Sequence, residues 1–182
     1  MEIGRTLRFE NRAQWRAWLE ENGANESEIW LLYPRRSSGL TRIPYSDAVE
    51  EALCFGWIDG VEKSFDADNS AQRFTPRRAK SNWSQLNRER ARRLIATGQM
   101  TPAGLAALGD VLAEEFQIAP DILSALQSDA TTYRHFEAFP DYYQRIRIGF
   151  IEEVRKQPAV FEKRLVYFLK MTAQNQRFGT FK

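Results

Sequence analysis

Hydrophobic residues recur with the spacing of an α-helix in two segments near the start of the chain. Residues 11–23 begin at Asn11, a good capping residue, and end at Gly23, a common helix stop. The apolar residues on one face of this segment are Ala13, Trp15, Trp18 and Leu19. Residues 46–56 repeat the pattern, with Ser46 at the capping position. The spacing predicts two helices that each bury one face.

Other segments have the composition or alternation of β-strands. Residues 28–33 (EIWLLY) are β-branched, aromatic and apolar, which is typical of a buried strand. Residues 57–65 and 72–75 flank the turn-forming residues 66–69, and this arrangement predicts an antiparallel hairpin. Residues 7–10 are expected to add a short strand. The fold class predicted for this part is α+β, with a small antiparallel sheet and helices packed on it.

The rest of the chain has only the helical pattern. Helices are expected at 81–97 and 102–115, and four more in the last third: 121–128, 130–139, 142–157 and 159–172. We therefore predict an α+β domain over residues 1–116, followed by a helical C-terminal module over residues 117–182. The polar tail 174–182 is expected to be frayed.

Composition excludes several kinds of site. The 182 residues contain one cysteine and one histidine, so an internal disulfide and a multi-cysteine zinc site are excluded, and we expect no metal and no cofactor. No apolar run is long enough to span a bilayer. The N-terminal residues lack the apolar region of a secretory signal, so the expected location is the cytoplasm.

The net charge is only +2, but basic residues concentrate in one stretch. Between residues 73 and 93 a single acid, Glu89, stands against eight basic residues, a local charge of +7 by subtraction: Arg73, Arg77, Arg78, Lys80, Arg88, Arg90, Arg92 and Arg93. The stretch can be a solvated face, paired in part with the acidic residues 110–115, or an anion-binding surface. Nucleic-acid binding through 73–93 is a less favoured alternative, since no known reading motif is present.

The region 52–87 concentrates small, aromatic and charged residues too closely for a simple core segment. Arg73 and Arg77 are four residues apart, so an uninterrupted strand would place both on one face, where guanidinium groups can bind an oxyanion. The next helix would add its N-terminal N–H groups to such a site. The predicted ligand-binding residues are Trp57, Asp59, Lys63, Arg73, Thr75, Arg77, Ser81, Trp83, Ser84 and Asn87.

Two alternatives remain for the same residues. Asp59 is the candidate catalytic residue if the protein is an enzyme, acting as acid or base while Lys63 and Arg73 steer an anionic substrate. In the structural alternative Asp59 forms an ion pair with Lys63 or Arg73, Trp57 belongs to the core and the serines only cap a helix. Cys54 ends an apolar helical face and is expected to be buried and unreactive.

Several sequence words in this region resemble those of the YdeI/OmpD-associated (OmdA) family of bacteriocin-protection proteins. They are ALCFGWIDG (52–60), RFTPR (73–77), SNWS (81–84) and GQMTPAG (98–104), and the helices from residue 118 to Arg164 resemble the C-terminal module of that family. The resemblance implies a role in protection against stress or bacteriocins and brings no catalytic activity with it. Together with the arginines and tryptophans it suggests a small anionic ligand or an envelope-related protein partner.

Overall fold

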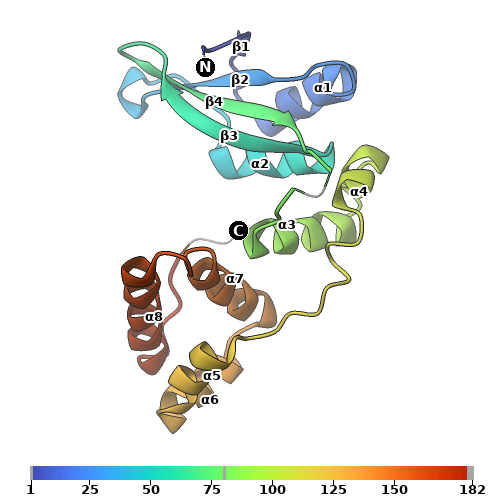
Figure 1. Cartoon of the computed structure of the whole chain (residues 1–182). Coiled ribbons are helices and arrows are strands. Elements are labelled where there is room, and N and C mark those ends of the chain that lie inside the picture. Colours follow the sequence, from blue (N-terminus) through green and yellow to red (C-terminus); the bar gives the residue numbers. More distant parts are fainter. Residues whose placement is uncertain (1, 80, 180–182) are drawn as a thin grey trace. The chain divides into compact units, whose positions relative to one another are not determined.

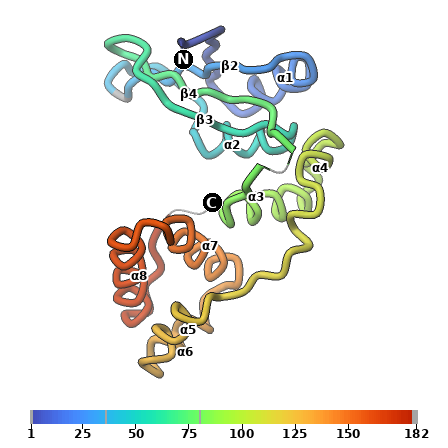
Figure 2. The backbone as a smooth tube through the Cα atoms, in the orientation of Figure 1, coloured from blue at the N-terminus to red at the C-terminus, as the bar shows by residue number. Residues whose placement is uncertain are grey.

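The computed structural model describes residues 2–79 and 81–179 (Figure 1). Contacts divide the chain into two units. The N-terminal unit comprises residues 1–82 and 90–112, and the C-terminal unit comprises residues 83–89 and 113–182. The border thus passes through helix α3 (Gln85–Ala96). Figure 2 traces the backbone through residues 109–119, which form no helix or strand between α4 and α5.

The N-terminal unit is built on a four-stranded sheet with the order β1-β2-β4-β3. The strands are β1 (Thr6–Leu7), β2 (Ile29–Pro34), β3 (Trp57–Ser64) and β4 (Asn69–Pro76). The α+β class is confirmed, and the β2–β4 and β3–β4 pairs are antiparallel as predicted. The edge pair β1–β2 is parallel, which differs from the antiparallel expectation. Helix α1 (Arg12–Asn22) supplies the crossover that a parallel pair requires.

The β3–β4 hairpin contains an irregularity that decides which side chains share a face. Asp59 lies opposite Phe74, whereas Lys63 lies opposite Ala71, and the register shifts by one residue between Asp59 and Glu62. Side chains alternate along a strand, so residues four apart would normally share a face. The bulge reverses this relation for Asp59 and Lys63 and places them on opposite faces.

Helices α1 and α2 (Tyr45–Cys54) contact the face of the sheet that carries Asp59 and Phe74. Asn11 caps α1 as predicted, because its side chain accepts the Gln14 N–H at 3.0 Å. The predicted cap Ser46 instead lies inside α2, which begins after Pro44 without a side-chain cap. Helix α4 (Pro102–Leu108) is shorter than predicted, since Gly109 ends it with a positive φ of 52°.

Aromatic rings make up the core of the N-terminal unit. The ring centroids of Trp15 and Trp18 are 5.2 Å apart, and Phe74 lies edge-on to Trp15 at 5.5 Å. Trp57 lies edge-on to Trp18 at 6.0 Å, and its indole N–H donates to the Gly23 carbonyl at 3.0 Å. Such ring pairs stabilise a core beyond the area that they bury.

The C-terminal unit packs four helices around its own core: α5 (Pro120–Gln127), α6 (Ala130–Ala138), α7 (Asp141–Glu152) and α8 (Pro158–Ala173). The core residues are Ile122, Leu126, Phe136, Ile148, Ile151 and Phe168. The expectation of a frayed tail is wrong as far as residue 179, because the Phe178 N–H donates to Tyr143 Oη at 2.9 Å and the Phe178 ring packs on Tyr167 at 4.9 Å. Residues 180–182 of that predicted tail lie outside the described residues. None of the helices in the described ranges has the length and apolar character needed to cross a membrane.

Candidate functional site

The N-terminal unit has a surface hollow at one end of its sheet, where β2 ends and the β3–β4 hairpin turns. Its volume is about 400 Å³. The residues that carry its chemistry are Tyr33, Arg35, Arg42, Glu62, Lys63 and Ser70. The backbone N–H of Arg35 donates to the Asp68 carbonyl at 2.8 Å, which ties the end of β2 to the hairpin turn. The turn itself is ordered by Asp66, whose carboxylate accepts the N–H groups of Asp68 and Asn69 at 2.7 and 2.8 Å.

The hollow has a surplus of positive charge. Its described lining includes the three basic residues Arg35, Arg42 and Lys63 and one acid, Glu62, so the local charge is +2 by subtraction. The Arg42 guanidinium lies 5.7 Å from the centre of the Tyr33 ring and donates to the Pro34 carbonyl at 2.7 Å. This contact holds one cation at the mouth of the hollow on an aromatic face.

Tyr33 presents a polar group that none of the described residues satisfies. The residue is only 7% exposed, and its hydroxyl is buried with no hydrogen-bond partner among the described residues. Burial raises the pKa of the Tyr33 phenol, an effect that the charge of Arg42 opposes. The group therefore stays protonated at neutral pH and keeps a hydrogen to donate.

Asp59 is the centre of a second polar cluster on the same face of the sheet. The Tyr45 hydroxyl donates to its carboxylate, and the charges of Arg77 and Arg90 interact with it. Burial lowers the pKa of Arg77 to about 10, against the opposing charge of Asp59. Burial also raises the pKa of Tyr45, and the hydrogen bond to Asp59 adds to this rise. Asp59 is not among the residues that line the hollow.

The predicted partners of Asp59 lie elsewhere. Arg73 is opposite Trp30 in the β2–β4 register, on the other face of the sheet from Asp59, and its Nε donates to Glu28 Oε2 at 2.8 Å. Lys63 is separated from Asp59 by the bulge. Thr75, half-buried, pairs in register with Ile58. The geometry therefore does not gather Asp59, Lys63 and Arg73 around one substrate.

The remaining predicted site residues are used in local contacts. Arg77 follows the end of β4 and donates to Ser81 Oγ at 3.0 Å and to the Asn82 carbonyl at 3.3 Å. Ser84 Oγ accepts the Asn87 N–H at 3.2 Å, which is the geometry of a helix cap at the start of α3. Trp57 is 1% exposed within the aromatic core, and Trp83 is also buried.

Several arginines of the basic stretch form ion pairs. The Arg88 side chain lies 2.6 Å from Glu114, as the pairing with the acidic residues 110–115 anticipated. Arg93 pairs with Glu50, and Arg90 lies 4.0 Å from the same carboxylate. Glu50 and its neighbour Glu51 are buried and also bind two arginines of α1, Arg12 and Arg16. Much of the local charge thus belongs to internal pairs, which weakens the argument for a nucleic-acid surface.

The lone cysteine and the lone histidine show no sign of catalytic use. Cys54 is fully buried, and burial together with the charge of Glu51 raises the pKa of its thiol to about 11. His135 belongs to the C-terminal unit, where its Nδ1 lies 3.0 Å from the Thr172 carbonyl. Within residues 2–79 and 81–179 no group of three His, Cys, Asp or Glu side chains could hold a metal ion.

Sequence reasoning missed most of the hollow, namely Tyr33, Arg35, Arg42, Glu62 and Ser70, and it also missed Tyr45 beside Asp59. Arg35 and Arg42 belong to a polar loop that looked like a simple connection. The available signal was the pair of arginines beside a strand-end tyrosine, since aromatic and cationic side chains often form one binding surface.

Comparison with protein families matches two regions of the chain. Residues 7–107 match the family described as "Domain of unknown function (DUF8412)". Residues 115–175 match the family described as "Bacteriocin-protection, YdeI or OmpD-Associated" (OmdA). The resemblance to the OmdA family is confirmed by the second match, whereas the sequence words from residues 52–104 fall within the first. No curated protein and no solved structure matches the chain.

Proposed function

Because the chain belongs to the DUF8412 family over residues 7–107 and carries a bacteriocin-protection, YdeI or OmpD-associated region over residues 115–175, we propose that it is a stress-protection protein that binds a small anion. The proposed binding site is the hollow at the end of the sheet. A metabolite that carries phosphate or carboxylate groups has the matching chemistry, since Arg and Lys side chains bind such oxyanions through charge-assisted hydrogen bonds.

The observation that carries this proposal is the convergence of three cations on a hollow bordered by an unsatisfied phenol. Arg35, Arg42 and Lys63 come from two separate segments, and Glu62 is the one acid among the described residues that line the hollow. Like charges that face one hollow repel one another, and a bound anion reduces that repulsion.

Binding is favoured over catalysis by the position of Asp59. Its carboxylate is already hydrogen-bonded to Tyr45, and Arg73 lies on the opposite face of the sheet. An acid or base must lie within hydrogen-bond reach of its substrate, and Asp59 does not line the hollow. An envelope-related partner, to which the OmpD-associated description points, is the alternative ligand class.

The proposal is tested by thermal unfolding of the full chain with inorganic phosphate, citrate and a nucleoside monophosphate. A ligand that binds only the folded protein raises the melting temperature with concentration. Arg35→Ala should weaken the affinity for the stabilising anion about tenfold or more, because a lost charge-assisted hydrogen bond costs roughly 1.5–3 kcal/mol. Arg35 is exposed, so its loss should leave unfolding without ligand nearly unchanged.

The matched control is Arg78→Ala, which removes the same charge from an exposed residue of the same unit outside the hollow. It should bind the anion like the unmodified protein. An equal loss of anion affinity in Arg35→Ala and Arg78→Ala would show that binding depends on the overall charge of the protein and not on the hollow. An absence of stabilisation by all three anions would exclude the small-anion function and leave the protein partner.

A further inference from the structure

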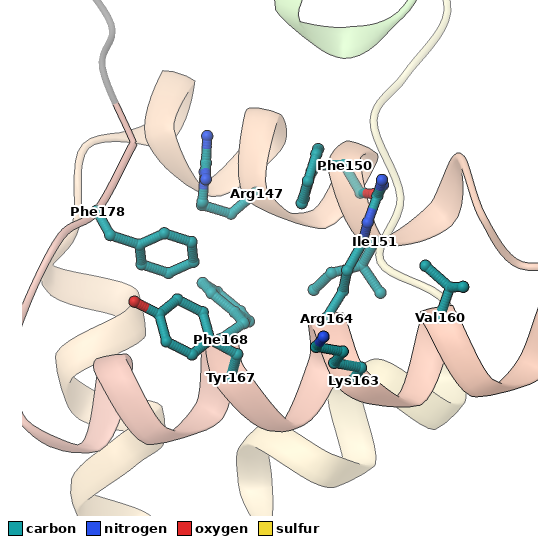
Figure 3. A pocket seen from close by; sticks show the side chains of 9 residues that line it. All are labelled: Arg147, Phe150, Ile151, Val160, Lys163, Arg164, Tyr167, Phe168 and Phe178. Atoms are coloured by element: carbon teal, nitrogen blue, oxygen red, sulfur yellow. The ribbon is translucent and has the colours of Figure 1, made fainter.

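A second cavity lies within the C-terminal unit, between helices α7 and α8 and the tail that follows α8 (Figure 3). Its volume is about 300 Å³, at the lower end of the range for small-molecule sites. The apolar side chains that border it are Phe150, Ile151, Val160, Tyr167, Phe168 and Phe178. The tail closes one side, because the Phe178 backbone is tied to Tyr143 and its ring packs on Tyr167.

The floor and the walls of this cavity differ in exposure. Ile151 and Phe168 are fully buried and belong to the core, whereas Phe150 is 40% and Tyr167 48% exposed. Apolar surface that faces water without a partner gains free energy when an apolar ligand covers it. The walls therefore favour a ligand with a hydrocarbon or aromatic body.

Three cations border the same cavity, and none of its described lining residues is acidic. The Arg147 guanidinium is buried and lies 4.8 Å from the Phe178 ring and 5.6 Å from the Phe150 ring. The Arg164 guanidinium stacks 3.6 Å from the Phe150 ring centre and donates to the Phe150 carbonyl. Lys163 is exposed at the opening. Glu153, which is not among the lining residues, interacts electrostatically with Arg164.

We infer that this cavity binds a small amphiphilic anion, with an apolar body of moderate length ending in a single carboxylate, sulfate or phosphate group. The body would lie against Phe150, Tyr167 and Phe168, and the anionic end would meet Lys163 and Arg164. A neutral molecule would satisfy only the apolar half of the site, and a small polyanion only the charged half. This site is separate from the hollow of the N-terminal unit and does not depend on the function proposed there.

The test is calorimetric titration of the full chain with decanoate below its micelle concentration, and with decanol as the uncharged counterpart. Decanoate should bind, and decanol should bind about tenfold more weakly, because it lacks the charge-assisted contact. Lys163→Gln and Arg164→Gln should each weaken decanoate binding, and Lys163→Gln, at an exposed residue, should leave decanol binding nearly unchanged. Lys170→Gln, at an exposed residue of α8 outside the cavity, is the control and should bind decanoate normally.

Val160→Trp should abolish binding of both compounds by filling the cavity, since Val160 is 38% exposed and borders it. If that variant does not fold, Lys163→Glu at the exposed opening decides the question by reversing a charge. The inference is overturned if decanoate does not bind, if decanol binds equally well, or if neither Val160→Trp nor Lys163→Glu weakens decanoate binding. Arg35→Ala should leave decanoate binding unchanged, so failure here and failure of the proposed function are distinguishable.

Discussion

Two tyrosines of the N-terminal unit have the same phenol group in different surroundings. The Tyr45 hydroxyl donates to the Asp59 carboxylate, whereas the Tyr33 hydroxyl has no partner among the described residues. Burial raises the pKa of both phenols, so both remain donors at neutral pH. The same group is therefore satisfied by a local hydrogen bond in Tyr45 and is not satisfied by any described residue in Tyr33.

Removal of each hydroxyl should therefore have a different effect. Tyr33→Phe should leave the free energy of unfolding unchanged or raise it by up to about 1 kcal/mol, because it removes an unsatisfied buried group. Tyr45→Phe removes the same atom from a hydrogen bond to a carboxylate, and it should lower the free energy of unfolding by about 1 kcal/mol. Urea denaturation of the two variants provides the comparison. A loss at Tyr33 as large as the loss at Tyr45 would show that the Tyr33 hydroxyl already has a structural role.

At the scale of elements, α4 approaches the end of α2 through a glycine. A Cβ atom added to Gly104 would lie 2.2 Å from the Cys54 carbonyl oxygen. The Thr101 hydroxyl and backbone N–H donate to that same oxygen at 2.6 and 3.1 Å. The last turn of α2 and the first turn of α4 are thus joined at one carbonyl group, and no larger residue fits between them.

Gly104→Ala should lower the free energy of unfolding by about 1–3 kcal/mol, because the helices must separate to make room. In an exposed helix the same change would stabilise by roughly 1 kcal/mol, so the sign is diagnostic. Thermal or urea unfolding measures it. Ala106→Gly at an exposed position of α4 is the control, and its loss of about 1 kcal/mol reports helix propensity alone. A higher free energy of unfolding in Gly104→Ala would contradict the close approach of Gly104 to the Cys54 carbonyl oxygen.

Signals within a few residues of one another predicted most of the helices and strands. Which side chains meet at a site depends on contacts between residues far apart in the chain, and the sequence did not predict those contacts. Asn11 and the 66–69 turn predicted α1 and the hairpin because capping and turn chemistry act within a few residues. The register shift after Asp59 depends on how two strands pair, so spacing along the chain did not show that Lys63 lies on the opposite face from Asp59. Arg42 lines the same hollow as residues between 62 and 70 of the hairpin. The spacing of residues within one helix or strand does not show that these two segments lie close together.

At the scale of the whole molecule, two separate cores are expected to respond separately to mutation. Phe168 is fully buried in the C-terminal unit, and Phe74 is fully buried in the N-terminal unit. Truncation of either ring should cost on the order of 3–5 kcal/mol in its own unit. The two units have their own internal contacts, so local opening need not spread from one to the other.

Hydrogen exchange followed by mass spectrometry resolves this expectation. Phe168→Ala should accelerate amide exchange in α5–α8 and leave β2–β4 protected, and Phe74→Ala should do the reverse. Each variant is thus the control for the other. Equal acceleration throughout the chain in both variants would show that the two units unfold as one cooperative body.

The ion pairs of the basic stretch, residues 73–93, also affect how the proposed anion would approach the protein. A positive and a negative group held within a few ångströms cancel at a distance, so the pairs of this stretch with Glu50 and Glu114 add little to the electrostatic potential far from the protein. The remaining charge of the hollow is screened within about 8 Å at physiological ionic strength. An approaching anion therefore diffuses almost unguided until it is near the site. Under the proposed function, discrimination between anions would then depend on how long each one stays bound.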